Sequence, residues 1–175
     1  MNKSLRILFL VLLVSLAIAF LWGIIPQIKS SVHFVLDPSA GKLLDWNMTF
    51  GLIIISAIIS FITMLLQKYT TDQETLRQIK KEQKLLQEEM KTIRDNPKKL
   101  MELQRKQFEF VPRTLDITIR PLVYTSVPII LFFRWFGDYF ASHPYKFFGF
   151  LSWIWAYIIF SIILSSIFKK VLNVA

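Results

Sequence analysis

The chain has 175 residues, a formal net charge of +9 and no cysteine, which excludes disulfide frameworks, cysteine-type zinc clusters and thiol nucleophiles. Its two histidines, His33 and His143, lie far apart and its five glycines are isolated. The sequence therefore has neither a metal-ligand pattern nor a glycine-rich phosphate loop. We predict that the protein is not an enzyme and uses no cofactor and no metal.

Hydrophobic residues make up 54% of the chain and fall into four long blocks, with most of the charged residues between them. This segregation is typical of an all-α, polytopic membrane protein rather than of a soluble globular domain. In a membrane protein, an excess of basic residues records topology and contact with the lipid bilayer, and we expect no DNA binding.

The first block, within residues 1–26, ends at Pro26 and is long enough to cross the hydrocarbon, which takes about 20 residues. Lys3, Arg6 and the sequence Ala17-Ile18-Ala19 also fit a signal peptide with a cleavage site. The apolar run continues to Ile25, whereas the hydrophobic region of a cleaved signal spans about 7–15 residues. We therefore favour an uncleaved anchor, with a signal peptide as the alternative.

The rest of the chain divides into alternating apolar and polar segments. Residues 27–46 form a polar connection that closes at Trp46, where an interfacial aromatic residue is expected. The further segments that we predict are a first core span at 47–66, a cytoplasmic hairpin at 67–113, a second core span at 114–137, an outer turn at 138–146 and a third core span at 147–170.

The hydrophilic segment 67–113 has the residue spacing of an antiparallel coiled coil. Apolar residues recur with the 3-4 spacing of a coiled-coil seam in two arms, at Leu76, Ile79, Leu86, Met90 and Ile93 and then at Leu100, Leu103 and Phe110. Gln83 and Gln107 occupy the remaining seam positions, and Asp95-Asn96-Pro97 separates the arms. Because Asn and Asp favour turns and Pro favours the first position of a helix, we predict a helical hairpin.

The distribution of basic residues predicts the topology. More than half of the 21 Lys and Arg residues lie in the hairpin, and such an excess marks the cytoplasmic side. Lys3 and Arg6 flank the first block, and Lys169 and Lys170 follow the last. With four spans, we expect the N-terminus, the hairpin and the C-terminus to be cytoplasmic, in the plasma membrane.

The first core span has a one-sided polar stripe, which consists of Thr49, Ser56, Ser60, Thr63 and Gln67. At about 100° per residue these side chains fall within a narrow sector of a helix. Ser and Thr allow close packing between membrane helices, so the stripe can serve packing alone. The alternative is that it lines a partly hydrated groove.

The second core span has a matching stripe that includes Thr118 and Thr125 together with Pro121 and Pro128. Each proline frees the backbone carbonyl four residues earlier, which then needs another hydrogen-bond partner. Arg120 lies one to two turns into this span from the cytoplasmic side. It can extend toward the inner headgroups, or it can line a groove that faces the cytoplasm.

The order of one span, a basic hairpin and two closely spaced spans resembles the archaeal YidC-like proteins of the YidC/Oxa/Alb superfamily of membrane protein insertases. The run Asn96-Pro97-Lys98-Lys99-Leu100-Met101 is similar to the start of the family's second hairpin arm. The run from Arg120-Pro121 through Pro128 to Arg134-Trp135-Phe136 looks like the family's second core span. The resemblance covers about Trp46 to Lys170.

The resemblance implies an insertase or chaperone that moves nascent transmembrane segments into the bilayer through a polar groove, without ATP. It implies that nascent membrane proteins are partners and that the ribosome is a candidate partner. The groove residues that it implies are Thr49, Ser56, Ser60, Thr63, Gln67, Thr118, Arg120 and Thr125. The hairpin residues expected to contact the ribosome or the nascent chain are Met90, Lys91, Arg94, Lys98, Lys99 and Met101.

The sequence departs from the bacterial relatives at one functional position. Those relatives have a positive residue in the first core span, whereas this chain has none there before Lys68, and Arg120 is the candidate substitute. Two other functions fit the pattern. A structural or tethering protein would use the hairpin to bind a coiled-coil partner, and a small channel would line an oligomeric pore with the polar stripes.

Overall fold

The computed structural model describes residues 3–93 and 97–174, and the regular elements among them are all helical. This confirms the prediction of an all-α, polytopic membrane protein. The elements are α1 (Lys3–Ile24), α2 (Pro26–Leu36), the π-helical segment η1 (Asp37–Gly41), α3 (Lys42–Trp46), α4 (Met48–Thr70), α5 (Gln73–Thr92), α6 (Pro97–Ser142) and α7 (Trp153–Val171).

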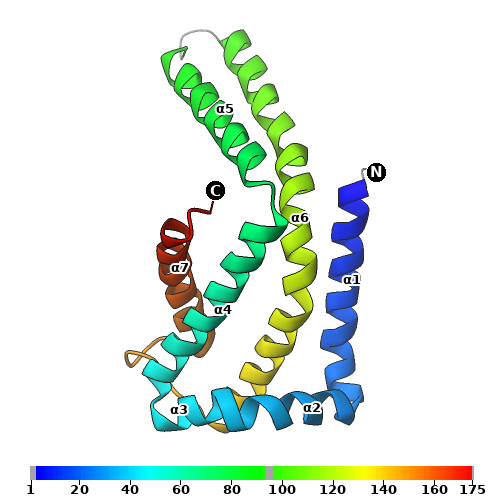
Figure 1. Ribbon diagram of the computed structural model, residues 1–175, viewed down its shortest axis with the longest axis vertical. Coiled ribbons are helices and arrows are strands. Elements are labelled where there is room, and N and C mark those ends of the chain that lie inside the picture. The colour runs from blue at the N-terminus through cyan, green and yellow to red at the C-terminus, as the bar shows by residue number, and fades with distance from the viewer. Residues whose placement is uncertain (1–2, 94–96, 175) are drawn as a thin grey trace.

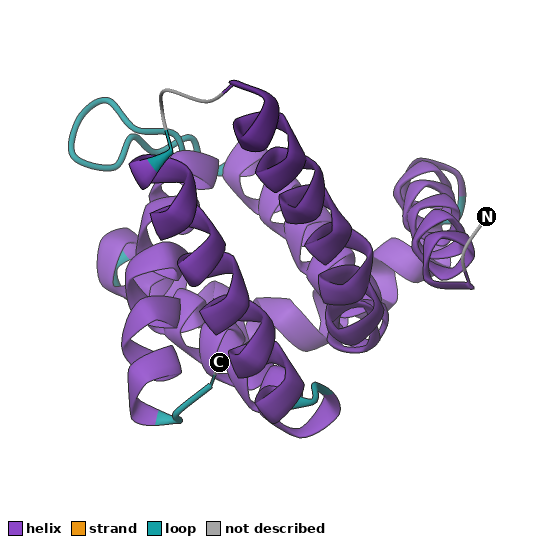
Figure 2. Cartoon of the chain, turned by 90° about the horizontal axis from the view of Figure 1, so that it is seen from above, coloured by secondary structure: helices purple, strands orange, loops and turns teal. Residues whose placement is uncertain are grey.

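The helices that can cross a membrane stand side by side around α6 (Figure 1). Three of the described helices are long and apolar enough to span, namely α1 over Arg6–Ile24, α4 and α7, and the number is four if the two parts of the bent helix α6 count as one span. Helix α1 packs on α6, while α4 packs on both α6 and α7. Figure 2 shows α1 at the edge of the bundle when the molecule is viewed from the hairpin end. In Figure 1 both termini lie toward the hairpin.

Helix α6 is both the second arm of the hairpin and part of the helical bundle. It runs without interruption from Pro97 to Ser142 and contains Pro112, Pro121 and Pro128. Its two parts, Pro97–Ile119 and Pro121–Ser142, are inclined by 65° to one another. A proline inside a helix removes one backbone hydrogen bond and its ring crowds the preceding turn, which explains why the bend falls at Pro121.

A platform made of α2, η1 and α3 lies across the end of the bundle that is opposite the hairpin (Figure 1). The polar composition of residues 27–46 predicts a connection between spans, and the structure shows that this connection is largely helical. Its helical signal is the i, i+4, i+8 spacing of Ile28, Val32 and Leu36, which pack against the hydrophobic core. Pro26 occupies the first helical position, where its missing N–H is tolerated.

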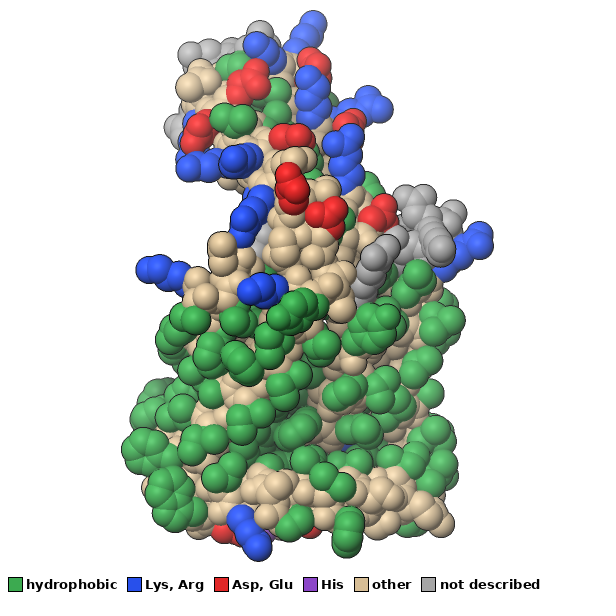
Figure 3. Space-filling model, viewed as in Figure 1, with side chains coloured by type: hydrophobic (Ala, Val, Ile, Leu, Met, Phe, Trp, Pro, Cys, Tyr) green, Lys and Arg blue, Asp and Glu red, His purple; other side chains and the backbone are tan. Residues whose placement is uncertain are grey.

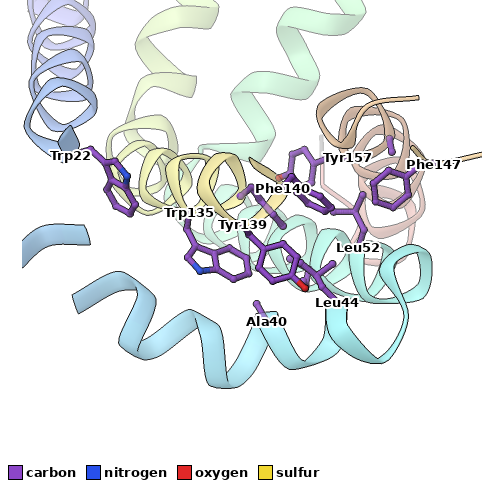
Figure 4. Close-up of a cluster of buried hydrophobic side chains, with 12 residues drawn as sticks. Trp22, Ala40, Leu44, Leu52, Trp135, Tyr139, Phe140, Phe147 and Tyr157 are labelled. Atoms are coloured by element: carbon purple, nitrogen blue, oxygen red, sulfur yellow. The ribbon is translucent and has the colours of Figure 1, made fainter. Parts of the chain in front are cut away.

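The hydrophobic core lies beside this platform and is built largely from aromatic rings (Figure 4). Trp135, Phe136 and Phe147 are fully buried. The rings of Phe140 and Trp153 stack with their centroids 5.7 Å apart, and the Phe133 and Tyr157 rings meet edge to face at 5.1 Å. The bundle is therefore packed most densely at its outer end, away from the hairpin.

The hairpin consists of α5 and the first part of α6, which pack against one another. Of the predicted seam residues, Leu76, Ile79 and Leu103 are buried and the others that are described are partly buried. Asp72 caps α5 by accepting hydrogen bonds from the Thr75 N–H at 3.0 Å and the Thr75 hydroxyl at 2.7 Å. These bonds lower the pKa of Asp72 below its ordinary value. The predicted turn at Asp95-Asn96 lies outside the described residues.

Candidate functional site

Two adjoining hollows form a groove between α4 and α6 at membrane level, which we call the α4–α6 groove. The hollow nearer the hairpin has a volume of 110 Å³ and is lined by Ile59, Ile62, Thr63, Leu66, Tyr124, Thr125, Pro128, Ile129 and Phe132. The hollow nearer the platform has a volume of 240 Å³ and is lined by Leu36, Ser39, Ala40, Leu43, Ile55, Ile58, Ile59 and Phe132. Because Ile59 and Phe132 line both hollows, the two lie next to one another along the same pair of helices.

Two threonine side chains, one from α4 and one from α6, line the groove. The Thr63 hydroxyl donates to the Ile59 carbonyl at 2.8 Å, and the Thr125 hydroxyl donates to the Pro121 carbonyl at 2.9 Å. Each hydroxyl proton is therefore hydrogen-bonded to a backbone carbonyl of its own helix. The lone pairs of both oxygens stay available to accept hydrogen bonds from a backbone N–H or from water.

The two ends of the groove are lined by different elements. Ser39, Ala40 and Leu43 of the platform line the end away from the hairpin, and the buried aromatic rings of Trp135 and Phe136 lie at the same end. Toward the hairpin, Tyr124 is exposed and Leu66 is only partly buried.

The predicted stripe on α4 divides between the groove and the packed interior. Thr63 lines the groove, but Ser56 and Ser60 are buried and line neither hollow. Measured around the helix axis from Ile55, which lines the groove, Ser56 and Ser60 point about 100° and 140° away. They therefore lie between the groove face and Phe61. The Phe61 ring lies 5.5 Å from the Phe168 ring of α7. Ser56 and Ser60 thus occupy the packed side of α4, as small residues do where membrane helices approach closely.

The other predicted groove residues lie at or beyond the ends of the groove. Thr49 is at the start of α4, where its N–H donates to the Asn47 cap at 3.0 Å. Gln67 is at the junction with α5, and its carbonyl accepts from the Gln73 amide at 2.9 Å. The Thr118 hydroxyl donates to the Thr114 carbonyl at 2.8 Å. The side chain of Arg120 lies outside the described residues.

The predicted contact residues of the hairpin lie near its tip. Lys91, Lys98 and Met101 are exposed and Met90 is partly buried. The Lys99 ammonium lies 3.9 Å from the Glu89 carboxylate. Arg94 lies outside the described residues.

The hairpin also has an apolar hollow that the sequence analysis missed. A hollow of 500 Å³ between the arms is lined by Gln83, Met90, Gln104, Gln107, Phe108 and Val111. Phe108 is 72% exposed and Val111 is 51% exposed. Neither residue occupies a seam position, and their exposed apolar character in a hydrophilic segment is the signal that could have found them.

A polar cluster at the outer end was also missed, and it joins three elements through Asp138. The Asp138 carboxylate lies 2.9 Å from the Lys29 ammonium and accepts from the Trp22 indole at 3.0 Å. His33 Nε2 lies 3.4 Å from the same oxygen. No group of His, Cys, Asp and Glu suited to a metal ion occurs among the described residues. The cluster therefore acts as a clamp that holds α1 and the platform on α6.

Replacing Asp138 with alanine should destabilise the fold by about 1–3 kcal/mol, because the Trp22 indole and the Lys29 ammonium lose their acceptor. The measurement is thermal unfolding in detergent, with proteolysis near Ile25 as a local probe of α1. Ser142→Ala is the control, since the Ser142 hydroxyl donates only to the Asp138 carbonyl of its own helix. Equal midpoints for the two variants would contradict the clamp.

Comparison with protein families identifies the central part of the chain. A family model described as integral membrane protein EMC3/TMCO1-like matches residues 33–148. The matched region contains α4, the hairpin and α6, and thus both walls of the α4–α6 groove. Comparison with curated proteins and with solved structures gave no match.

Proposed function

Since the chain belongs to the EMC3/TMCO1-like family of integral membrane proteins, within the Oxa1/YidC/Alb3 insertase superfamily, we propose that it is a membrane protein insertase. It helps nascent transmembrane segments enter the bilayer without ATP, in the manner of the archaeal YidC-like proteins. The observation that supports this most directly is the α4–α6 groove, which is lined by Thr63 and Thr125 near the hairpin and reaches the platform at its other end.

The groove lowers the barrier for a polar segment by giving it partners within the membrane. An unpaired backbone group in hydrocarbon costs several kcal/mol. Thr63 and Thr125 offer hydroxyl oxygens to the N–H groups of an incoming chain. The apolar walls, such as Ile62 and Ile129, accept its hydrophobic side chains. A segment can leave the groove sideways into the lipid once its backbone N–H and C=O groups are hydrogen-bonded within its own helix.

The hairpin receives the substrate before it reaches the groove. Its hollow combines Met90, Phe108 and Val111 with three glutamine side chains, and flexible methionine surfaces suit varied apolar segments. The basic residues near the tip, including Lys91 and Lys98, face solvent. They are suited to the acidic surface of a ribosome or to a nascent chain.

The proposed orientation places the hairpin and both termini in the cytoplasm, with the protein in the plasma membrane. The Lys and Arg residues are concentrated on the hairpin, whereas the opposite end carries few of them (Figure 3). A basic excess of this kind marks the cytoplasmic side. The end of the groove nearer the hairpin then faces the compartment where membrane proteins are synthesised.

Site-specific photocrosslinking during translation of a short membrane protein tests the proposal. A photoreactive residue at Ile62, which lines the groove and is 50% exposed, should crosslink to the nascent chain. The same probe at Ile163 of α7, which is 52% exposed and lines neither hollow, should crosslink mainly to lipid. Ser60, which is 3% exposed, should give no crosslink to the nascent chain.

Equal yields of nascent-chain crosslinks from Ile62 and Ile163 would mean that the groove has no special access to substrate. The insertase proposal would then fail. A single stoichiometric partner captured by a probe at Phe108, together with that result, would instead support a tethering protein whose hairpin binds a helical partner.

A further inference from the structure

The end of α7 is docked on the base of the hairpin. The Arg77 guanidinium of α5 donates to the Asn173 carbonyl and to the Asn173 side-chain oxygen, both at 2.8 Å. Asn173 has a positive φ of 54°, which turns the chain back after α7, and Val174 is buried. The first turns of α5 and the last turn of α7 are therefore held together at the neck between the hairpin and the membrane bundle.

This docking brings two lysines into contact without an acidic partner. Lys80 follows Arg77 by one turn of α5, and Lys169 precedes Asn173 by one turn, so the Arg77–Asn173 bonds bring the two lysines near one another. Both side chains are hydrogen-bond donors and carry positive charge. Burial, together with the Lys169 ammonium, lowers the pKa of Lys80 to about 8. Among the described residues no carboxylate forms an ion pair with either lysine.

The pair lies at the level of the lipid headgroups. Lys169 and Lys170 end the apolar span Trp153–Val171, and lysines at the end of a span extend to the interface. Figure 3 shows Lys and Arg side chains around the neck, next to the edge of the apolar surface. On the cytoplasmic side of a membrane this level carries the phosphate groups of anionic lipids.

We propose that Lys80 and Lys169 form a binding site for the phosphate group of an anionic phospholipid. Each ammonium donates to a different phosphate oxygen, and the negative charge offsets the repulsion between the two lysines. Arg77 and Asn173 are positioning residues, because they hold the end of α7 against α5. The site does not depend on the insertase proposal. It places an anionic phospholipid at the base of the hairpin.

The test uses the purified full-length protein in detergent, titrated with short-chain phosphatidylglycerol. Matched titrations use short-chain phosphatidylcholine and inorganic phosphate. Saturating phosphatidylglycerol should raise the unfolding midpoint of the wild type by about 5 °C, and native mass spectrometry should detect one retained lipid. Phosphatidylcholine should have a much smaller effect, because its choline group neutralises the phosphate.

Two substitutions and two controls locate the effect. Lys80→Gln and Lys169→Gln should abolish the gain from phosphatidylglycerol, whereas Lys81→Gln, at the next residue of α5, should keep it. Lys80→Arg should also keep it, which separates loss of charge from loss of fold. The proposal fails if the wild type gains nothing or if Lys80→Gln gains as much as the wild type. An equal gain from inorganic phosphate would also overturn it, since the site would then bind a soluble anion.

The pH dependence of stability gives an independent readout. The pKa of Lys80 is lower in the folded protein, at about 8, than its ordinary value of 10.5. The unfolded chain therefore binds more protons between these values, and the stability of the lipid-free protein should rise as the pH increases from 8 to 10.5. The charged groups one turn to either side of Lys80 on α5 are Arg77 and Lys84, and Lys169 and Lys170 lie at the end of α7. Bound phosphatidylglycerol should remove most of this rise, and an unchanged rise would contradict the site.

Discussion

Replacement of Thr125 by tryptophan is expected to reduce the insertion of a short membrane protein by about tenfold or more. Thr125 lines the hollow of 110 Å³ at the hairpin end of the α4–α6 groove, and an indole ring would fill that hollow. A rise of 1.36 kcal/mol in the barrier corresponds to about a tenfold lower rate. A lost polar contact in the membrane is of similar size or larger. The measurement is protease protection of the substrate in reconstituted vesicles.

The control is Leu122→Trp, which adds the same ring one turn away on α6. Leu122 is 45% exposed and does not line the groove, so this variant should insert substrate at the rate of the wild type. Unfolding midpoints of both variants show whether each bundle is intact. An intact Thr125→Trp protein with full activity would exclude this groove as the substrate route.

Replacement of Gly51 by alanine is expected to lower the free energy of unfolding by about 1–3 kcal/mol. Gly51 is in the first turn of α4, where α3 crosses it. A Cβ atom there would lie 2.7 Å from the Leu43 carbonyl carbon and 2.9 Å from the Leu44 Cα. Both are backbone atoms, which cannot move aside as a flexible side chain can. Thermal or denaturant unfolding in detergent measures the effect.

Gly137→Ala is the matched control for this substitution. Gly137 is also in a membrane helix, and a Cβ atom there would meet nothing within 4 Å. Because alanine favours a helix by up to about 1 kcal/mol over glycine, this variant should be as stable as the wild type or more stable. If Gly51→Ala behaved in the same way, the close crossing of α3 and α4 would be refuted.

The features that the sequence predicted are those that depend on local periodicity. Long apolar blocks identified the spans, and the 3-4 spacing from Leu76 to Phe110 identified seam positions that are buried or partly buried wherever they are described. Such patterns follow from the geometry of a single helix. The sequence also predicted the polar stripe on α4, but it did not show which neighbouring helix each side chain of the stripe faces. Ser60 faces the packed interior and Thr63 faces the groove, and only the positions of α6 and α7 decide between these two sides.

The features that the sequence did not reveal join residues that are far apart in the chain. Lys29 and Trp22 meet at Asp138, more than 100 residues later, and Lys80 meets Lys169. No spacing rule connects such residues, since the contacts arise only when the helices pack. The platform was predictable in principle, because Ile28, Val32 and Leu36 have helical spacing, but its short apolar stripe lies among polar residues.

The continuity of α6 has a mechanical consequence. At 1.5 Å per residue, its 46 residues correspond to a path of about 70 Å, from the tip of the hairpin to the outer end of the bundle. The clamp at Asp138 fixes the far end, and Pro112, Pro121 and Pro128, each of which leaves a backbone hydrogen bond missing, lie between the tip and that end. The second arm of the hairpin and the groove wall that carries Thr125 and Pro128 are thus one helix, and a sideways load on the tip reaches that wall only as far as the bend at Pro121 resists it.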